Sequence, residues 1–89
     1  MKSVKIELLS NEEIEQRGIR DWPIWTKEES KFPWHYDQNE QCLILEGEII
    51  VRSGDEECTI TAGDFVTFAQ GFDCEWEIVT AVKKHYSFG

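Results

Sequence analysis

From residue 34 onward, apolar and polar residues alternate in short runs of regular spacing, and turn residues separate the runs. We expect strands at residues 34–37, 40–45, 48–52, 57–61, 65–68, 73–79 and 82–88. The connections that carry turn signals are Gly47, Ser53-Gly54-Asp55, Ala62-Gly63-Asp64 and Gln70-Gly71. Many short strands joined by glycine turns predict an all-β sandwich or barrel.

Strand alternation separates an inner from an outer face, because successive side chains of a strand point to opposite sides. On the strand at 40–45, one face carries Glu40, Cys42 and Ile44. On the strand at 73–79, the face opposite the acidic side chains carries Cys74, Trp76 and Ile78. On the last strand, Lys84 shares its face with Val82, Tyr86 and Phe88, so that an amine is expected on an otherwise apolar face.

The outer leucine face of the strand at 40–45, made of Leu43 and Leu45, needs cover. A second sheet layer, residues 1–30 or a partner subunit could supply it, so the sequence is compatible with a homodimer. Trp22 and Trp25 precede the barrel and are expected to pack across its outside or against a second subunit.

The start of the chain predicts one strand and one short helix. The run from Val4 to Leu8 alternates apolar with charged residues, as a strand does. Ser10 opens a capping-box pattern and Gly18 is a natural helix end, so residues 11–17 are expected to form a helix of about two turns.

Length, charge and composition limit the kinds of protein that the chain can be. Its 89 residues predict a single domain, residues 1–89, with one core and one pocket. A net charge of −9 lacks the positive footprint of a nucleic-acid-binding protein, and an anionic membrane surface would repel it. The start lacks the apolar run of an export signal, and no run is long enough for a membrane span. We therefore expect a cytoplasmic protein whose three cysteines are reduced.

Two glycine-centred blocks carry a resemblance to a known family. Glu40 is followed by six residues and Gly47, and a second block spans residues 63–74. These blocks resemble those of the cupins, which are double-stranded β-helix (jelly-roll) barrels. The resemblance implies an all-β jelly-roll barrel with its core at about residues 20–88 and one short N-terminal helix.

Five short motifs narrow the resemblance to a subgroup. They are WPIW at 22–25, WHY at 34–36, LEGE at 45–48, FDCEW at 72–76 and KHY at 84–86. In these motifs the chain is similar to the small cupins grouped with ureidoglycine aminohydrolase and with ethanolamine-utilisation proteins. The subgroup implies a fold rather than an activity, because one fold hosts many chemistries.

The positions that carry metal-binding imidazoles in cupins hold other side chains here. Trp34 and Tyr36 stand at the two histidine places before Glu40, and Cys74 stands at the third. Indole does not ligate a metal, a phenol holds its proton near neutral pH, and by strand parity neither histidine points inward. We therefore expect no metal site and no other cofactor. The alternative is a metal-dependent enzyme with a rearranged Glu40–Cys74 site.

The inner faces are expected to form an aromatic-lined pocket with a few polar groups. The expected ligand-binding residues are Trp34, Tyr36, Glu40, Cys74, Trp76, Lys84 and Tyr86. Such a pocket is typical of a small-molecule site, and we expect it to bind a small polar metabolite. Because an isolated buried carboxylate is costly, Glu40 is expected to pair with Lys84 or to bond to Tyr36.

An enzyme is the alternative to a binding protein, and the sequence leaves the choice open. A metal-free acid–base enzyme of the epimerase or dehydratase kind would use Glu40, Tyr36 and Lys84. Cys74 would be a nucleophile only beside a cation such as Lys84, and its other reading is an inert buried thiol. The sequence therefore assigns no catalytic residue.

Overall fold

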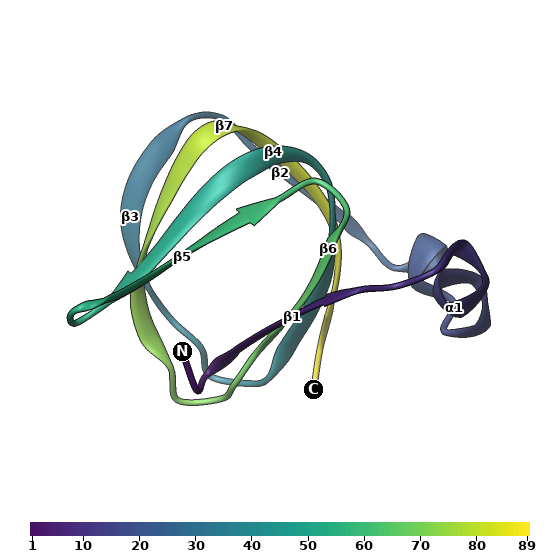
Figure 1. Ribbon diagram of the computed structural model, residues 1–89, viewed down its shortest axis with the longest axis horizontal. Helices are drawn as coiled ribbons and strands as arrows, with labels where there is room; N and C mark the ends of the chain where they lie inside the picture. The colour runs from purple at the N-terminus through teal and green to yellow at the C-terminus, as the bar shows by residue number, and fades with distance from the viewer.

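The structure, a computed structural model that describes residues 1–89, is built mostly of antiparallel strands (Figure 1). Its strands are β1 (Val4–Leu8), β2 (Ile24–Lys27), β3 (Ser30–His35), β4 (Glu40–Ser53), β5 (Glu56–Thr61), β6 (Asp64–Phe68) and β7 (Asp73–Phe88). One short helix, α1 (Asn11–Gln16), and a 3-10 turn, η1 (Ile19–Asp21), lie between β1 and β2. The expected all-β class with one short N-terminal helix is confirmed.

Two long strands organise the sheet. β4 pairs with β5, β6 and β7, and β7 pairs with β2, β3 and β4, always antiparallel. β1 extends the sheet beyond β6. The strands curve around one interior in Figure 1, and α1 lies outside the ring that they form. The inward faces of β4 and β7 therefore belong to the same interior, which is where the candidate site is built.

β4 and β7 are each one continuous strand where we expected two. The segments 40–45 and 48–52 join through Gly47, so the turn expected there is wrong. Gly47 has φ +104° and lies among register shifts against β7, which marks a bulge rather than a chain reversal. The segments 73–79 and 82–88 also form one strand, β7, which continues through Thr80 and Ala81. The turns expected at 54–55, 62–63 and 70–71 are confirmed.

The strand expected at 34–37 lies earlier in the chain, as β3 at Ser30–His35. Pro33 falls inside it, opposite Glu75 of β7. β3 pairs with β7 alone, so one of its edges is free of strand partners. A proline is tolerated on such an edge strand, where a missing N–H costs no ladder hydrogen bond.

The core divides into two apolar clusters. The larger fills the barrel with inward side chains, among them Cys42, Ile44, Trp76, Ile78 and Val82, as strand parity predicts. The smaller lies outside the sheet and joins Leu43 to Ile14, Ile19 and Phe65. The cover that the leucine face needs therefore comes from α1 and η1, within residues 1–30, and Leu45 packs against the same cluster.

The N-terminal helix begins at Asn11 as expected and ends at Gln16, one residue before the expected end. The Ser10 hydroxyl accepts a hydrogen bond from the Glu13 N–H at 3.1 Å, and the Glu13 carboxylate accepts one from the Ser10 N–H at 3.2 Å. Gly18 follows with φ +66°. Trp22 packs against Phe65, with 6.3 Å between ring centroids, so it covers the outside of the sheet as expected. The structure holds no helix with the length and apolarity that crossing a membrane requires.

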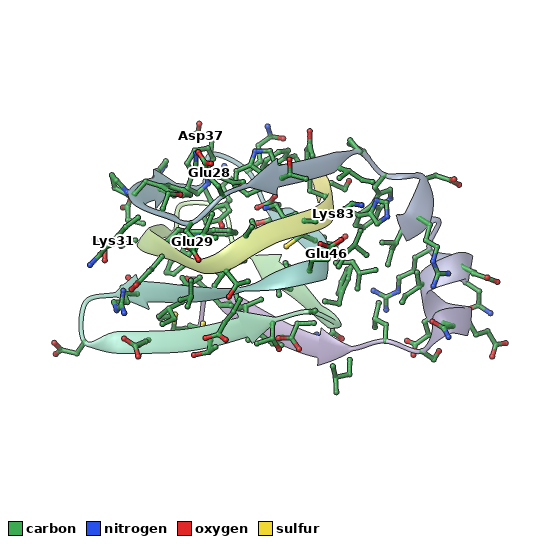
Figure 2. The ribbon with its side chains drawn as sticks, turned by 90° about the horizontal axis from the view of Figure 1, so that it is seen from above. Glu28, Glu29, Lys31, Asp37, Glu46 and Lys83 are labelled. Atoms are coloured by element: carbon green, nitrogen blue, oxygen red, sulfur yellow. The ribbon has the colours of Figure 1, made fainter.

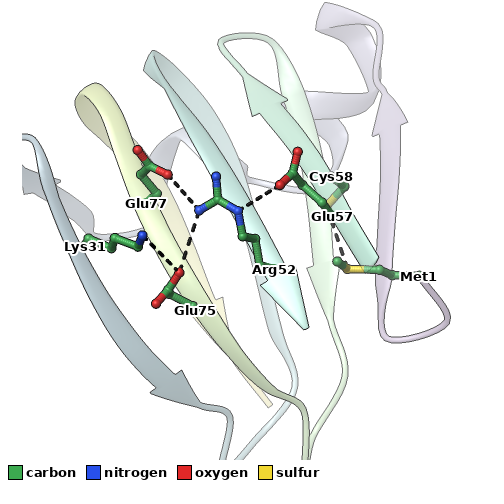
Figure 3. A network of polar contacts seen from close by, with 7 residues as sticks. All are labelled: Met1, Lys31, Arg52, Glu57, Cys58, Glu75 and Glu77. Carbon is green, nitrogen blue, oxygen red and sulfur yellow. Dashed lines mark hydrogen bonds and ion pairs between the residues drawn. The ribbon is translucent and has the colours of Figure 1, made fainter. Parts of the chain in front are cut away.

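Charged side chains link the strands on the outer face (Figure 3). The Arg52 guanidinium of β4 donates to Glu77 of β7 at 2.7 Å and to Glu57 of β5 at 2.8 Å. Glu75, also on β7, lies 3.7 Å from Lys31 of β3. The acidic face expected on the strand at 73–79 is thus the outer face, and the apolar face opposite it points into the barrel.

Candidate functional site

A pocket of about 620 Å³ opens into the barrel among β2, β3, β4 and β7. Twelve residues line it, and the seven hydrophobic ones are all aromatic. These are Trp25, Phe32, Trp34, Tyr36, Trp76, Tyr86 and Phe88. The polar lining consists of one serine, one carboxylate and three lysines, which are Ser30, Glu40, Lys27, Lys31 and Lys84. An aromatic wall with a few convergent polar groups is the usual composition of a small-molecule site.

A buried ion pair lies in this lining. The Lys84 ammonium donates a hydrogen bond to Glu40 Oε2 at 2.9 Å, and the two residues are 5% and 3% exposed. They meet because β4 and β7 are neighbours and the two inward faces share one interior. Of the two arrangements expected for Glu40, the pairing with Lys84 is the one that the structure contains.

Two indole rings flank the Lys84 ammonium. Its nitrogen lies 4.9 Å from the ring centroid of Trp25 and 4.9 Å from that of Trp76. Both contacts are cation–π interactions, which strengthen when the ammonium is shielded from water. The two rings meet edge to face, with 6.2 Å between centroids. The side chain of Lys84 is therefore held in place by one carboxylate and two aromatic faces.

The expectation that Trp25 packs outside the barrel is wrong. β2 pairs with β7 so that Trp25 lies directly opposite Lys84, and cross-strand neighbours share a face. Trp25 consequently lines the pocket. The signal in the sequence is the two-residue period of β2, in which Trp25 and Lys27 have the same parity, but Pro23 obscured the strand.

Tyr36 forms part of the rigid wall. Its side chain is 1% exposed and stacks on Phe68, with 4.7 Å between ring centroids. Its hydroxyl oxygen accepts a hydrogen bond from Trp76 Nε1 at 3.1 Å. Burial, and next the negative charge of Glu40, raise the pKa of the Tyr36 phenol far above its usual range. The phenol therefore stays protonated and orients Trp76.

The pocket brings together six of the seven ligand-binding residues expected from the sequence. The six are Trp34, Tyr36, Glu40, Trp76, Lys84 and Tyr86. Cys74 does not line the pocket. Sequence reasoning missed the side chains supplied by β2, β3 and the end of β7, which are Trp25, Lys27, Ser30, Lys31, Phe32 and Phe88. Ser30, Phe32 and Trp34 alternate at a spacing of two, and this pattern could have identified the inner face of β3.

The residues present do not fit the metal centre that a cupin barrel implies. Glu40 is the one retained ligand position, and its carboxylate is bound to Lys84. No three side chains of the His, Cys, Asp and Glu types gather to hold an ion. His35 Nδ1 lies 2.6 Å from Asp73 on the surface, and His85 Nδ1 lies 2.9 Å from the Trp22 carbonyl. The place next to Glu40 thus carries a cation that belongs to the chain itself.

The cysteines are held as thiols. Burial raises the pKa of Cys42 to about 12. Burial, followed by the charge of Asp73, raises the pKa of Cys74 to about 11. A thiol is a nucleophile only as the thiolate, so neither side chain is activated near neutral pH.

We expect Cys74 to react with iodoacetamide near neutral pH roughly tenfold or more slower than a free cysteine does, because the lower thiolate fraction outweighs the higher nucleophilicity of a more basic thiolate. Its rate should rise about tenfold per pH unit on the alkaline side, because only the thiolate attacks. Peptide mass spectrometry of samples quenched over time measures the rate at each cysteine. Rapid alkylation of Cys74 near neutral pH would show a lowered pKa and restore a nucleophilic role.

Comparisons with known proteins agree with this fold. The family model described as the EutQ-like cupin domain matches residues 14–86. A DUF861 family protein of Thermotoga maritima, known from a crystal structure, is 44% identical to this chain. It superposes with a TM-score of 0.93, over 97% of this chain and 99% of that chain.

Two solved structures of proteins described as EutQ are more distant in sequence. The putative ethanolamine utilization protein Q of Salmonella typhimurium is 27% identical, with a TM-score of 0.66 over 96% of this chain and 68% of that chain. The EutQ protein of Clostridium difficile is 12% identical and shows the fold alone, with a TM-score of 0.67 over 73% of this chain and 52% of that chain. No curated protein matches the sequence. The expected cupin barrel and the resemblance to ethanolamine-utilisation cupins are confirmed, and the chain belongs to the family of EutQ-like cupin domains.

Proposed function

We propose that the protein binds a small polar metabolite in the aromatic pocket. The observation that carries the proposal is the buried Lys84–Glu40 pair, which lines a pocket whose apolar walls are entirely aromatic. Burying two charges is costly, and a pair of this kind contributes little to stability compared with apolar side chains of similar volume. Binding of a polar ligand, and not stability, would account for a buried ion pair in the pocket.

The walls suit a flat or partly apolar ligand. Trp34 is 46% exposed and Phe88 is 48% exposed, so both rings offer apolar surface to a molecule that enters. Tyr86 and Phe88 meet edge to face, with 5.6 Å between centroids, and Trp34 meets Tyr36 in the same way. Covering such surface contributes about 25 cal/mol per Å² of apolar area removed from water. The ion pair would then orient the polar end of the ligand.

The test is a thermal-shift screen of a metabolite library, followed by calorimetric titration of the compounds that raise the melting temperature. We expect Trp34→Ala to weaken the binding of such a compound roughly tenfold, because one stacking face is lost. The matched control is Leu8→Ala, which removes an apolar side chain that is 80% exposed and lies outside the pocket. It should leave affinity unchanged. A hit whose affinity survives Trp34→Ala would place its binding site elsewhere and contradict the proposal.

A second function, metal-free acid–base catalysis, is favoured by one observation. Lys84 and Glu40 both line the pocket, so an amine and a carboxylate face a bound substrate with which a general acid and base would exchange protons. This function predicts that a compound that binds is also consumed over time. Mass spectrometry of the reaction mixture measures that consumption, and Glu40→Gln should abolish it. A compound that binds and stays unchanged leaves binding alone as the function.

A further inference from the structure

The Lys84–Glu40 pair has hydrogen-bonding capacity that the protein does not use. An ammonium carries three N–H donors, and Lys84 gives one hydrogen bond, to Glu40 Oε2. The indole faces of Trp25 and Trp76 also lie close to the ammonium, and they accept no conventional hydrogen bond. Lys84 also lines the pocket. A ligand oxygen in the pocket can therefore accept a hydrogen bond from the ammonium.

Glu40 offers the complementary group. Oε2 is bound to Lys84, whereas Oε1 makes no hydrogen bond within the protein. No buried side-chain nitrogen or oxygen lacks a partner, so Oε1 is not sealed away from the pocket that Glu40 lines. An ionised carboxylate oxygen only accepts hydrogen bonds. The pair thus presents a donor and an acceptor side by side to whatever enters.

The pair is also neutral as a unit. One positive and one negative charge lie in contact and shielded from water. A charged ligand is therefore attracted by one member of the pair and repelled by the other. A charged ligand must in addition give up its own hydration when it enters. The pair therefore favours an uncharged polar group.

Resting on the proposed function, we infer that the pocket selects an uncharged group with a hydrogen-bond acceptor and a donor on neighbouring atoms, as in a primary amide. The carbonyl oxygen accepts from Lys84, and the N–H donates to Glu40 Oε1. A carboxylate of the same shape satisfies Lys84 but sets its second oxygen against Glu40. An amidinium satisfies Glu40 but sets its second nitrogen against Lys84.

The other charged groups near the pocket lie at its exposed side. Lys27 Nζ lies 5.5 Å from the Phe32 ring centroid, and Lys31 lies 3.7 Å from Glu75. The turn between β2 and β3 adds Glu28 and Glu29 beside them (Figure 2). Salt and water screen these exposed charges far more than a buried pair. These exposed charges consequently have little effect on which ligand group binds at Lys84 and Glu40.

Four probes of the same ring and similar size test the inference by calorimetric titration. Benzamide carries an acceptor and a donor, acetophenone an acceptor alone, benzoate a negative charge and benzamidinium a positive charge. We expect benzamide to bind about tenfold or more tightly than the other three, because a buried charged group left without its hydrogen bond is costly. The order should persist when salt is added, since the pair is buried.

Two variants change the sign of the selection and sharpen the test. Glu40→Gln leaves the positive charge of Lys84, so benzoate should become the tightest probe. Lys84→Met leaves the negative charge of Glu40, so benzamidinium should become the tightest. Circular dichroism at low temperature establishes that each variant is folded before titration. If a single variant is not folded, the double variant Lys84→Met/Glu40→Met replaces it, and its preference for benzamide should vanish.

The outcomes separate the inference from the proposed function. Acetophenone or benzoate binding to the wild type as tightly as benzamide overturns the inference and leaves binding in the pocket intact. Retention of the benzamide preference in the double variant overturns it as well. If no probe binds at millimolar concentration while library compounds still bind through Trp34, the inference fails alone. If neither probes nor library compounds bind, the proposed function fails with it.

Discussion

We expect Lys84→Met to lower the free energy of unfolding by about 3–5 kcal/mol, which is large for one substitution. Methionine has nearly the length of lysine, so little packing is lost. The loss comes instead from Glu40, which is 3% exposed and keeps its negative charge without the ammonium 2.9 Å away. Urea denaturation near neutral pH, followed by tryptophan fluorescence, measures the change.

A neighbouring lysine provides the control. Lys83 is on the same strand, but its side chain is 42% exposed and lies 4.0 Å from the exposed Glu46, at the positions labelled in Figure 2. Exposed pairs of this kind contribute about 0–1 kcal/mol, so Lys83→Met should change stability little. Equal losses of unfolding free energy for Lys83→Met and Lys84→Met would show that burial of the Lys84–Glu40 pair has no energetic consequence.

The double variant Lys84→Met/Glu40→Met separates the charge from the packing. Replacing a buried ion pair by apolar side chains of similar volume is often neutral or stabilising, so the double variant should recover most of the stability that Lys84→Met loses. A double-mutant cycle over the four proteins then gives the coupling energy between the two side chains. A double variant as unstable as Lys84→Met would assign the loss to packing against Trp25 and Trp76 and refute the electrostatic account.

The inner face of the barrel could be predicted from the sequence because strand alternation is strictly local. Side chains two residues apart point to the same side whatever the rest of the chain does, so Glu40 and Cys42, and likewise Trp76 and Lys84, fell on inner faces before any pairing was known. A second rule, that an isolated buried carboxylate is costly, limited Glu40 to two partners, Lys84 or Tyr36, and only the structure shows that the partner is Lys84.

What failed to be predicted depends on contacts between distant segments. Trp25 lines the pocket because β2 pairs with β7 in a register that sets it opposite Lys84, and no local pattern in 22–27 encodes that partner. Cys74 has the inward parity of Trp76 and lies opposite the pocket-lining Trp34, yet it does not line the pocket itself, because parity gives the face of a strand and not which side chains reach the cavity. Its high pKa likewise follows from tertiary burial.

Gly47 is the most informative of these failures, and it yields the second large prediction. A glycine between two alternating runs usually indicates a turn. Here its freedom from a side chain serves a close approach instead: a Cβ at this position would lie 2.5 Å from the Ala81 carbonyl oxygen, 2.8 Å from that of Thr80 and 2.8 Å from the Val82 Cα. All three atoms belong to the backbone of β7, which cannot move aside without breaking its pairing with β4.

We therefore expect Gly47→Ala to lower the free energy of unfolding by about 4 kcal/mol or more, at the upper end for one substitution. Gly63→Ala is the matched control, because Gly63 has φ +97°, close to the +104° of Gly47, but has no atom within 4 Å of an added Cβ. Backbone strain alone should cost Gly63→Ala about 1–3 kcal/mol. The difference between the two variants in urea denaturation isolates the contact between β4 and β7. Equal losses would show that the bulge yields to a methyl group, and that Gly47 is required for its backbone conformation and not for the close approach of the strands that hold Glu40 and Lys84 together.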